Sequence, residues 1–360
     1  MTIRRGKWAL TIDVVGGCNL RCPSCPVGNS SDKETPHGMM APELLDRICA
    51  KAARDFRNPT VYLYNWAEPF LHPNLDELIR VVRRHGLAAE LSTNLNISRN
   101  FAKVLAAGPR KLRVSVSGFN QENYGLTHKR GDIERVKANM AELARLKKRL
   151  GSKTKLTMLF HRYLENHEDE VLMKAYAEGL GYEFSAVWAY LMPAEKLVAL
   201  GQGGVNDARL NDEDRAVIGR FALDPVDAIE IARKHKDRPC RLLDHSLSLT
   251  HTGDVMLCCA TYDPKKFALG NFLDAPIQAL QQRRETHNYC GECMAQGGHV
   301  YFNYDAPEFD SAAVAHVKAR HPKIDVSRYT VKTKKTPLQR ALRGARRLIG
   351  IGRLDSRPSS

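Results

Sequence analysis

Residues 9–26 read ALTIDVVGGCNLRCPSCP, a predicted strand followed by a loop with three cysteines. Residues 9–15 predict a buried strand, because the run is apolar and rich in β-branched side chains. Cys18, Cys22 and Cys25 follow it at spacings of four and three, so one loop carries three thiolates. Thiolates suit iron–sulfur clusters, and three of them on a four-iron cluster leave one iron open to a substrate or cofactor. The alternative is a zinc knuckle, which more often has a second cysteine pair nearby.

Strands alternate with helices along the first half of the chain. The predicted strands lie at residues 9–15, 60–66, 87–93, 112–117, 155–160 and 184–191, and the predicted helices at residues 42–56, 75–85, 98–107, 133–150 and 168–178. Such alternation favours a parallel sheet with helices outside it. Six strand–helix units predict an α/β fold, a partial (β/α)6 barrel of the TIM type. Ligands of such folds sit at the carboxyl ends of the strands.

A second group of cysteines lies far along the chain. Cys240 and Cys258 are followed by Cys290 and Cys293, which form a CxxC pair. Four thiolates would complete the coordination of a [4Fe–4S] cluster. A structural zinc site is the alternative that the same spacing permits. Cys259 adjoins Cys258 and could be the ligand instead, but the spacing from Gly253 favours Cys258.

The remaining cysteine, Cys49, falls in a predicted helix and is expected to be an ordinary buried residue. Nine cysteines are an odd number, and the first residues have no apolar signal-peptide core. We therefore expect metal ligation rather than disulfides, and a cytoplasmic location.

Taken together, the motifs resemble the radical S-adenosylmethionine (SAM) superfamily. CNLRCPSCP, HGMM at residues 37–40 and AEPFLHP at residues 67–73 are similar to its SPASM and twitch branch. No cysteine follows Cys293, so the resemblance implies a small C-terminal twitch module, the shortened form of SPASM. The cysteine spacing resembles twitch enzymes of the 2-deoxy-scyllo-inosamine dehydrogenase type. We expect a radical SAM barrel at residues 8–198, a connector at 199–238, a twitch module at 239–304 and a basic tail at 305–360.

The resemblance also implies roles for individual residues. Cys18, Cys22 and Cys25 would hold the SAM-binding [4Fe–4S] cluster. Cys240, Cys258, Cys290 and Cys293 would hold an auxiliary one. Trp66 and Ala67 replace two glycines of the family motif whose acid would be Glu68. The residues expected to contact SAM are Glu68, Asn94, Ser115, Ser117 and Arg130.

The function implied is cleavage of SAM to a 5′-deoxyadenosyl radical that abstracts hydrogen from substrate. We expect a two-electron oxidation of a small molecule such as a sugar or cyclitol, with the auxiliary cluster as electron acceptor. Only 17 residues precede Cys18, which favours a small molecule over a peptide. A peptide-modifying maturase and a non-catalytic electron-transfer protein are the alternatives. The electron donor would be a flavodoxin or ferredoxin. His161, Tyr190 and His299 stay open as candidates for the general base.

The net charge of +15 is concentrated at the C-terminal end. From Arg328 onward there are ten Lys or Arg against one acid. Leu338, Leu342 and Ile349 fall on one helical face and arginines on another, which suits an acidic partner or an anionic membrane surface. A solvated basic tail is the simpler alternative. We expect no specific nucleic-acid binding, because aromatic side chains do not alternate with the charges.

Overall fold

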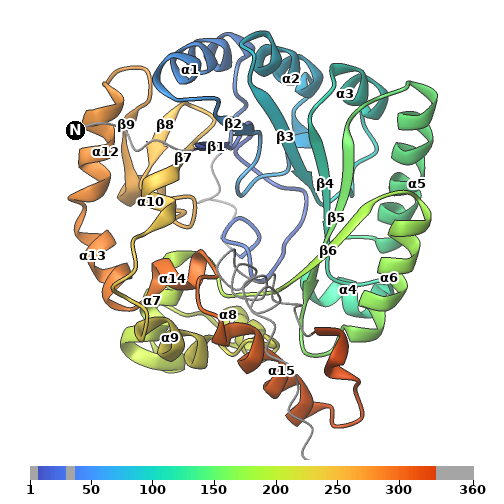
Figure 1. The fold of residues 1–360 in the computed structure, drawn as a ribbon, viewed down its shortest axis with the longest axis vertical. Coiled ribbons are helices and arrows are strands. Elements are labelled where there is room, and N and C mark those ends of the chain that lie inside the picture. Colours follow the sequence, from blue (N-terminus) through green and yellow to red (C-terminus); the bar gives the residue numbers. More distant parts are fainter. Residues whose placement is uncertain (1–6, 30–36, 330–360) are drawn as a thin grey trace, which may run out of the picture.

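The computed structural model describes residues 7–29 and 37–329 and contains a curved, mostly parallel sheet (Figure 1). Within the described residues the sheet has nine strands in the order β6-β5-β4-β3-β2-β1-β7-β8-β9. The strands are β1 Ala9–Ile12, β2 Thr60–Tyr62, β3 Ala88–Thr93, β4 Lys111–Val116, β5 Lys155–Arg162, β6 Glu183–Trp188, β7 Ser246–Leu249, β8 Asp254–Met256 and β9 Ala268–Asn271. The predicted α/β class is confirmed, since β1 to β6 pair in parallel.

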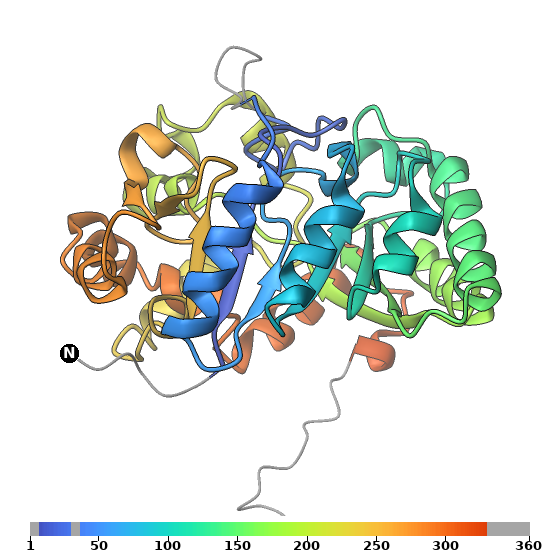
Figure 2. The same ribbon diagram turned by 90° about the horizontal axis from the view of Figure 1, so that it is seen from above.

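Helices cover the outside of the parallel strands (Figures 1 and 2). They are α1 Pro42–Asp55, α2 Leu75–Arg84, α3 Phe101–Ala107, α5 Ile133–Arg149 and α6 His167–Gly179. In β4 the residues Leu112, Val114 and Val116 are fully buried in the core against the helices. The alternate residues Arg113 and Ser115 therefore face the interior of the partial barrel. Cys49, on α1, is buried in the same core, as expected.

Strand β7 extends this sheet past the predicted domain boundary. It lies parallel to β1, with Leu10 opposite Leu247, and β8 and β9 follow in antiparallel pairing. Gly253 turns the chain between β7 and β8 at a φ of +85°, a conformation that favours glycine. The C-terminal cysteine region is thus joined to the barrel through the backbone of its first strand.

A second apolar core lies beyond the carboxyl ends of β5 and β6. It includes residues of α7 Ala194–Gly203, α8 Asp212–Ile218, α9 Pro225–Arg233, α14 Gly298–Phe302 and α15 Glu308–Arg320. We expected a tail from residue 305 onward. The structure instead describes α15 in the first part of that range, with Phe309, Ala313 and Val317 buried. Their spacing of four places them on one helical face.

Replacing Phe309 with alanine should therefore destabilise the folded chain. The Phe309 side chain is fully buried and contacts the rings of Tyr301 and Tyr304. We expect the free energy of unfolding, measured in urea, to fall by about 3 to 5 kcal/mol. Lys318→Ala on the exposed side of the same helix is the control and should change it by less than about 0.5 kcal/mol. Equal stability of the two variants would show that α15 does not belong to the folded body.

None of the helices among residues 7–29 and 37–329 is both long and apolar enough to span a bilayer. The basic amphipathic segment expected around Leu338 to Ile349 lies outside the described residues.

Candidate functional site

The first three cysteines lie in the loop that follows β1. The loop is tightly folded: the Cys25 amide donates to the Cys22 carbonyl over 3.0 Å, and the Asn29 amide donates to the Cys25 carbonyl over 2.8 Å. A Cβ at Gly28 would stand 2.3 Å from the Cys22 nitrogen, so the turn requires glycine there. The Arg21 amide donates to the Lys129 carbonyl over 3.0 Å and ties the loop to the turn before α5.

The thiols of this loop are buried close to one another. Burial, and after it the charge of Glu68, raise the pKa of Cys18 to about 12. Burial and the charges of Cys25 and Cys18 hold the pKa of Cys22 well above its usual value. Such a group of thiolates is stable only beside a compensating positive charge. An iron–sulfur cluster supplies that charge and accepts soft ligands, so the three residues fit the expected cluster.

Glu68 and Asn94 lie next to Cys18. Glu68 is buried, and its carboxylate accepts hydrogen bonds from the Thr93 hydroxyl over 2.7 Å and from the Asn94 amide over 2.8 Å. Burial raises the pKa of Glu68 to about 7. The Asn94 side chain donates to Cys18 Sγ over 3.5 Å. The carboxyl ends of β2 and β3 thus meet the cysteine loop at one point.

The other residues expected to contact SAM are more dispersed. Ser115 is half-buried on the inward face of β4. Ser117 is fully buried, and its hydroxyl is hydrogen-bonded to Thr127 and, over 2.9 Å, to His128 Nδ1. Arg130 is exposed in the turn after α4 (Gln121–Thr127), at a φ of +67°. Ser117 would have to exchange these bonds to contact SAM, so the roles of all three residues stay predictions.

Asp13 is a site residue that the sequence reasoning missed. Its Oδ1 accepts hydrogen bonds of 2.9 Å from the backbone amides of Asn65, Trp66 and Ala67. Burial raises the pKa of Asp13 to about 6, against the effect of these three bonds. The carboxylate therefore shapes the segment that carries Glu68. In the sequence, this role of Asp13 was indicated only by the position of an acidic residue at the end of an apolar strand.

Arg113 is a second residue that was missed. It points from β4 into the barrel, where its guanidinium donates to Ser92 Oγ over 3.2 Å and to the Tyr64 hydroxyl over 2.5 Å. Burial lowers the pKa of His161 to about 4, and the charge of Arg113 contributes to this shift. Thr157 lies opposite Arg113 in the parallel register, and its hydroxyl is buried without a hydrogen-bond partner among the described residues. The alternating pattern of β4 was the signal for an inward cation.

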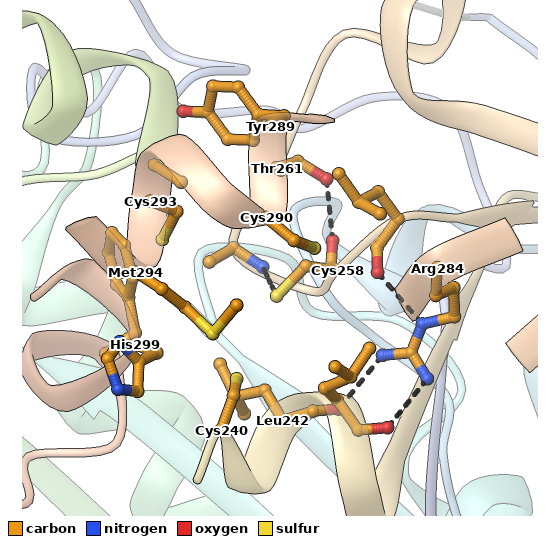
Figure 3. Close-up of a pocket in the computed structure, with 15 residues that line it drawn as sticks. Cys240, Leu242, Cys258, Thr261, Arg284, Tyr289, Cys290, Cys293, Met294 and His299 are labelled. Carbon is orange, nitrogen blue, oxygen red and sulfur yellow. Dashed lines mark hydrogen bonds between the residues drawn. The ribbon is translucent and has the colours of Figure 1, made fainter. Parts of the chain in front are cut away.

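The last four predicted ligands line one cavity (Figure 3). Cys240 precedes α10 (Arg241–His245), and Cys290 and Cys293 lie on α13 (Asn288–Ala295). Cys258, in the loop after β8, completes the set. Burial raises the pKa of Cys290 to about 11, and burial and the other cysteines raise that of Cys293. The arrangement brings together the four thiols that the sequence selected.

Cys258, and not Cys259, lines this cavity. Cys258 Sγ accepts a hydrogen bond of 3.4 Å from the Ala260 amide, and its carbonyl accepts one of 2.9 Å from the Thr261 hydroxyl (Figure 3). The Cys259 thiol lies close enough to that of Cys258 to interact with it, and its charge also contributes to the pKa of Tyr190, which burial chiefly raises. Because only Cys258 lines the cavity, Cys258 is favoured as the ligand.

Nowhere in the described ranges are three His, Cys, Asp or Glu side chains gathered closely enough to hold a single metal ion. A tetrahedral zinc site needs all its thiolates about 2.3 Å from one ion. A four-iron cluster distributes its thiolates over four metals, so they stand farther apart.

The two cysteine sites are linked through the side chains of Asn65 and Trp66. Trp66 Nε1 donates to the Thr261 carbonyl over 3.2 Å, and the Asn65 side chain donates to the Cys259 carbonyl over 3.3 Å. The Trp66 side chain thus connects the loop before Glu68 to the segment after Cys258.

Of the candidate bases, His161 and Tyr190 lie near Arg113, whereas His299 lines the C-terminal cavity.

Comparison with known proteins agrees with this geometry. Residues 12–175 match the family model of the radical SAM superfamily. Over 209 residues the chain is 26% identical to GTP 3′,8-cyclase from Rhodopseudomonas palustris, and the match covers 55% of each protein. Over 85 residues, 24% of this chain and 23% of the relative, it is 31% identical to the tungsten-containing aldehyde ferredoxin oxidoreductase cofactor-modifying protein of Pyrococcus furiosus. The chain therefore spans about half the length of the cyclase and less of the second relative.

Solved structures show the same fold at low identity. SuiB of Streptococcus suis, bound to the precursor peptide SuiA, matches with a TM-score of 0.54 and 12% identity over 80% of this chain and 67% of SuiB. Native anSMEcpe with bound AdoMet matches with a TM-score of 0.53 and 17% identity over 88% of this chain and 100% of that one. At these identities the likeness concerns the fold alone. The match of residues 12–175 to the family model, together with the cysteine loop and the parallel sheet, shows that this part of the chain is similar to the radical SAM superfamily.

Proposed function

We propose that this protein is a radical SAM oxidoreductase that removes two electrons from a small polar molecule, such as a sugar or cyclitol, with an auxiliary [4Fe–4S] cluster as electron acceptor. The observation that carries the proposal is the meeting of Cys240, Cys258, Cys290 and Cys293 at one cavity. Four thiolates leave no iron of a [4Fe–4S] cluster open, which suits electron transfer rather than substrate binding.

The chain's own residues would bind and shield the reactants. When bound, the first cluster and SAM supply a radical that removes hydrogen from substrate, and the auxiliary cluster accepts the remaining electron. Glu68 would accept hydrogen bonds from the amino group of SAM, and Asn94 would hold Cys18 in place. Burial lowers the pKa of His161 to about 4, so this imidazole would be neutral at pH 7. A flavodoxin or ferredoxin would supply the electron for SAM cleavage.

The interior of the barrel supports an anionic substrate. Among the described residues, Arg113 has no carboxylate within ion-pair distance, and its two hydrogen-bond acceptors are the hydroxyls of Ser92 and Tyr64. The partnerless Thr157 hydroxyl lies opposite it. A guanidinium in this setting binds a carboxylate or phosphate with two parallel hydrogen bonds. The proposed substrate is therefore a sugar or cyclitol that carries such a group.

The proposal is tested first by iron and sulfide analysis with EPR on anaerobically reconstituted protein. Two clusters require about eight irons per chain. SAM and dithionite are then added, and 5′-deoxyadenosine is measured. About four irons together with zinc would make the second site structural. Absence of 5′-deoxyadenosine would contradict the enzymatic function itself.

Arg113→Gln tests the substrate class. Phosphorylated or carboxylated sugars should stimulate 5′-deoxyadenosine formation at least about tenfold more than their neutral counterparts, since one charge-assisted pair contributes about 1.5 to 3 kcal/mol. The variant should lose this preference. Lys111→Gln is the matched control, because Lys111 lies on the same strand but pairs with Glu90 over 3.2 Å. A preference that survives in Arg113→Gln would exclude this anion site.

A further inference from the structure

Arg284 is a buried cation beside the C-terminal cysteines (Figure 3). It lies on α12 (Ile277–Glu285), and its side chain is 1% exposed. The guanidinium donates to the carbonyls of Leu257, Leu243 and Leu242 over 3.0, 3.1 and 3.0 Å, and to the Gln281 side chain over 3.0 Å. These four acceptors hold the planar group in one orientation, and all four are neutral.

The charge of Arg284 has no acidic partner in residues 7–29 and 37–329: no carboxylate lies within ion-pair distance of the guanidinium. An isolated buried charge is strongly unfavourable, so buried cations are normally paired with anions. Arg284 lines the cavity together with Cys240, Cys258 and Cys290. Neutral thiols would leave its charge uncompensated, whereas four thiolates around a [4Fe–4S] cluster carry a net negative charge.

We propose that Arg284 is the fixed counter-charge of the auxiliary cluster, and that it raises the cluster's reduction potential. This inference rests on the proposed function, because it requires a cluster at the four cysteines. Reduction adds one negative charge to the cluster, and a nearby positive charge in a low-dielectric interior stabilises the reduced form more than the oxidised form. Arg284 thereby makes the site a better electron acceptor, as the oxidation reaction requires.

The inference is tested by an EPR-monitored redox titration of the full chain. Cys18→Ala, Cys22→Ala and Cys25→Ala are introduced first, so that only the auxiliary cluster contributes to the spectrum. Arg284→Gln removes the charge but keeps an amide donor. Arg284→Lys keeps the charge but loses the planar arrangement of donors. Arg283→Gln is the matched control, because its exposed side chain lies on the same helix and also donates to a carbonyl, that of Leu269, over 2.7 Å.

In Arg284→Gln, the equilibrium constant for one-electron reduction should fall about tenfold or more, a shift of about 59 mV to lower potential. In Arg284→Lys this equilibrium constant should stay within about threefold of the parent's value, and in Arg283→Gln it should not change. Loss of the cluster from Arg284→Gln together with its retention in Arg284→Lys would also support the proposal, because the cluster would then require the positive charge. An unchanged potential in Arg284→Gln would overturn the proposal. Equal shifts or equal cluster loss in the Gln and Lys variants would also overturn it, because the hydrogen bonds rather than the charge would then matter.

Failure of the proposed function is visible separately. If the parent with the three alanines contains no iron, no auxiliary cluster exists, and both proposals fall before Arg284 is substituted. If it contains about four irons but its potential does not respond to Arg284→Gln, only the role of Arg284 is wrong.

Discussion

Protein with Cys18, Cys22 and Cys25 replaced by alanine should form no 5′-deoxyadenosine from SAM and should keep about four irons per chain. The three thiols lie close together in one buried loop, where thiolates would be stable only beside the positive charge of a metal cluster. Without them no iron with an open position remains to bind SAM. The second cavity draws its cysteines from other segments of the chain and should load independently. Iron analysis and product chromatography measure both effects.

Cys49→Ala is the control for these substitutions. Cys49 is fully buried on α1 in the main core and lies outside both sites. Its loss should leave about eight irons and full SAM cleavage, with a cost of about 1 kcal/mol in stability. Complete loss of iron from the triple alanine variant would contradict two independent sites.

Asp13→Ala should reduce both the stability of the chain and its binding of SAM. It removes one carboxylate that accepts hydrogen bonds from three backbone amides, those of Asn65, Trp66 and Ala67. Hydrogen bonds to a charged group contribute about 1.5 to 3 kcal/mol each, so we expect the free energy of unfolding to fall by about 3 to 5 kcal/mol. The segment leading to Glu68 would also lose its shape. The SAM concentration for half-maximal cleavage should rise about tenfold, in line with one lost charge-assisted contact.

Asp13→Asn separates geometry from charge. The asparagine oxygen still accepts from the three amides, so most of the stability and SAM affinity should return, with weaker bonds because the acceptor is neutral. Urea unfolding under anaerobic conditions and SAM titrations compare the three proteins. Equal behaviour of Asp13→Ala and wild type would show that the Trp66–Ala67 segment keeps its conformation without this carboxylate.

The sequence alone was sufficient for the α/β class and for the cysteine groups, because both are local signals. An apolar strand, a helix with one apolar face and a loop with three thiols are each readable within about 20 residues. Each predicted strand therefore overlaps one of β1 to β6, although β1 ends at Ile12 and β2 at Tyr62, before the predicted ends at residues 15 and 66. Cys49 was correctly predicted as buried for the same reason, since it falls on the apolar side of α1.

Features that depend on long-range contacts were not predictable in this way. Strand β7 pairs with β1 across more than 230 residues, as in the contact of the Thr11 hydroxyl with the Leu247 carbonyl. Helix α15 has little hydrophobic asymmetry beyond Phe309, Ala313 and Val317, so only its packing against the second core distinguishes it from a tail.

The importance of Asp13, Arg113 and Arg284 came only from the tertiary structure, which also supports the choice of Cys258 over Cys259 that the spacing from Gly253 favoured. Adjacent cysteines are equivalent as letters, but the turn at Ala260 and Thr261 directs one toward the cavity. Arg283 and Arg284 are also adjacent, yet one is exposed and the other is buried beside four cysteines. The chemical nature of the ligands is determined by residue type and local spacing. The charge balance around them depends on which side chains the fold buries together, and distance in space, not in sequence, sets the electrostatic energy.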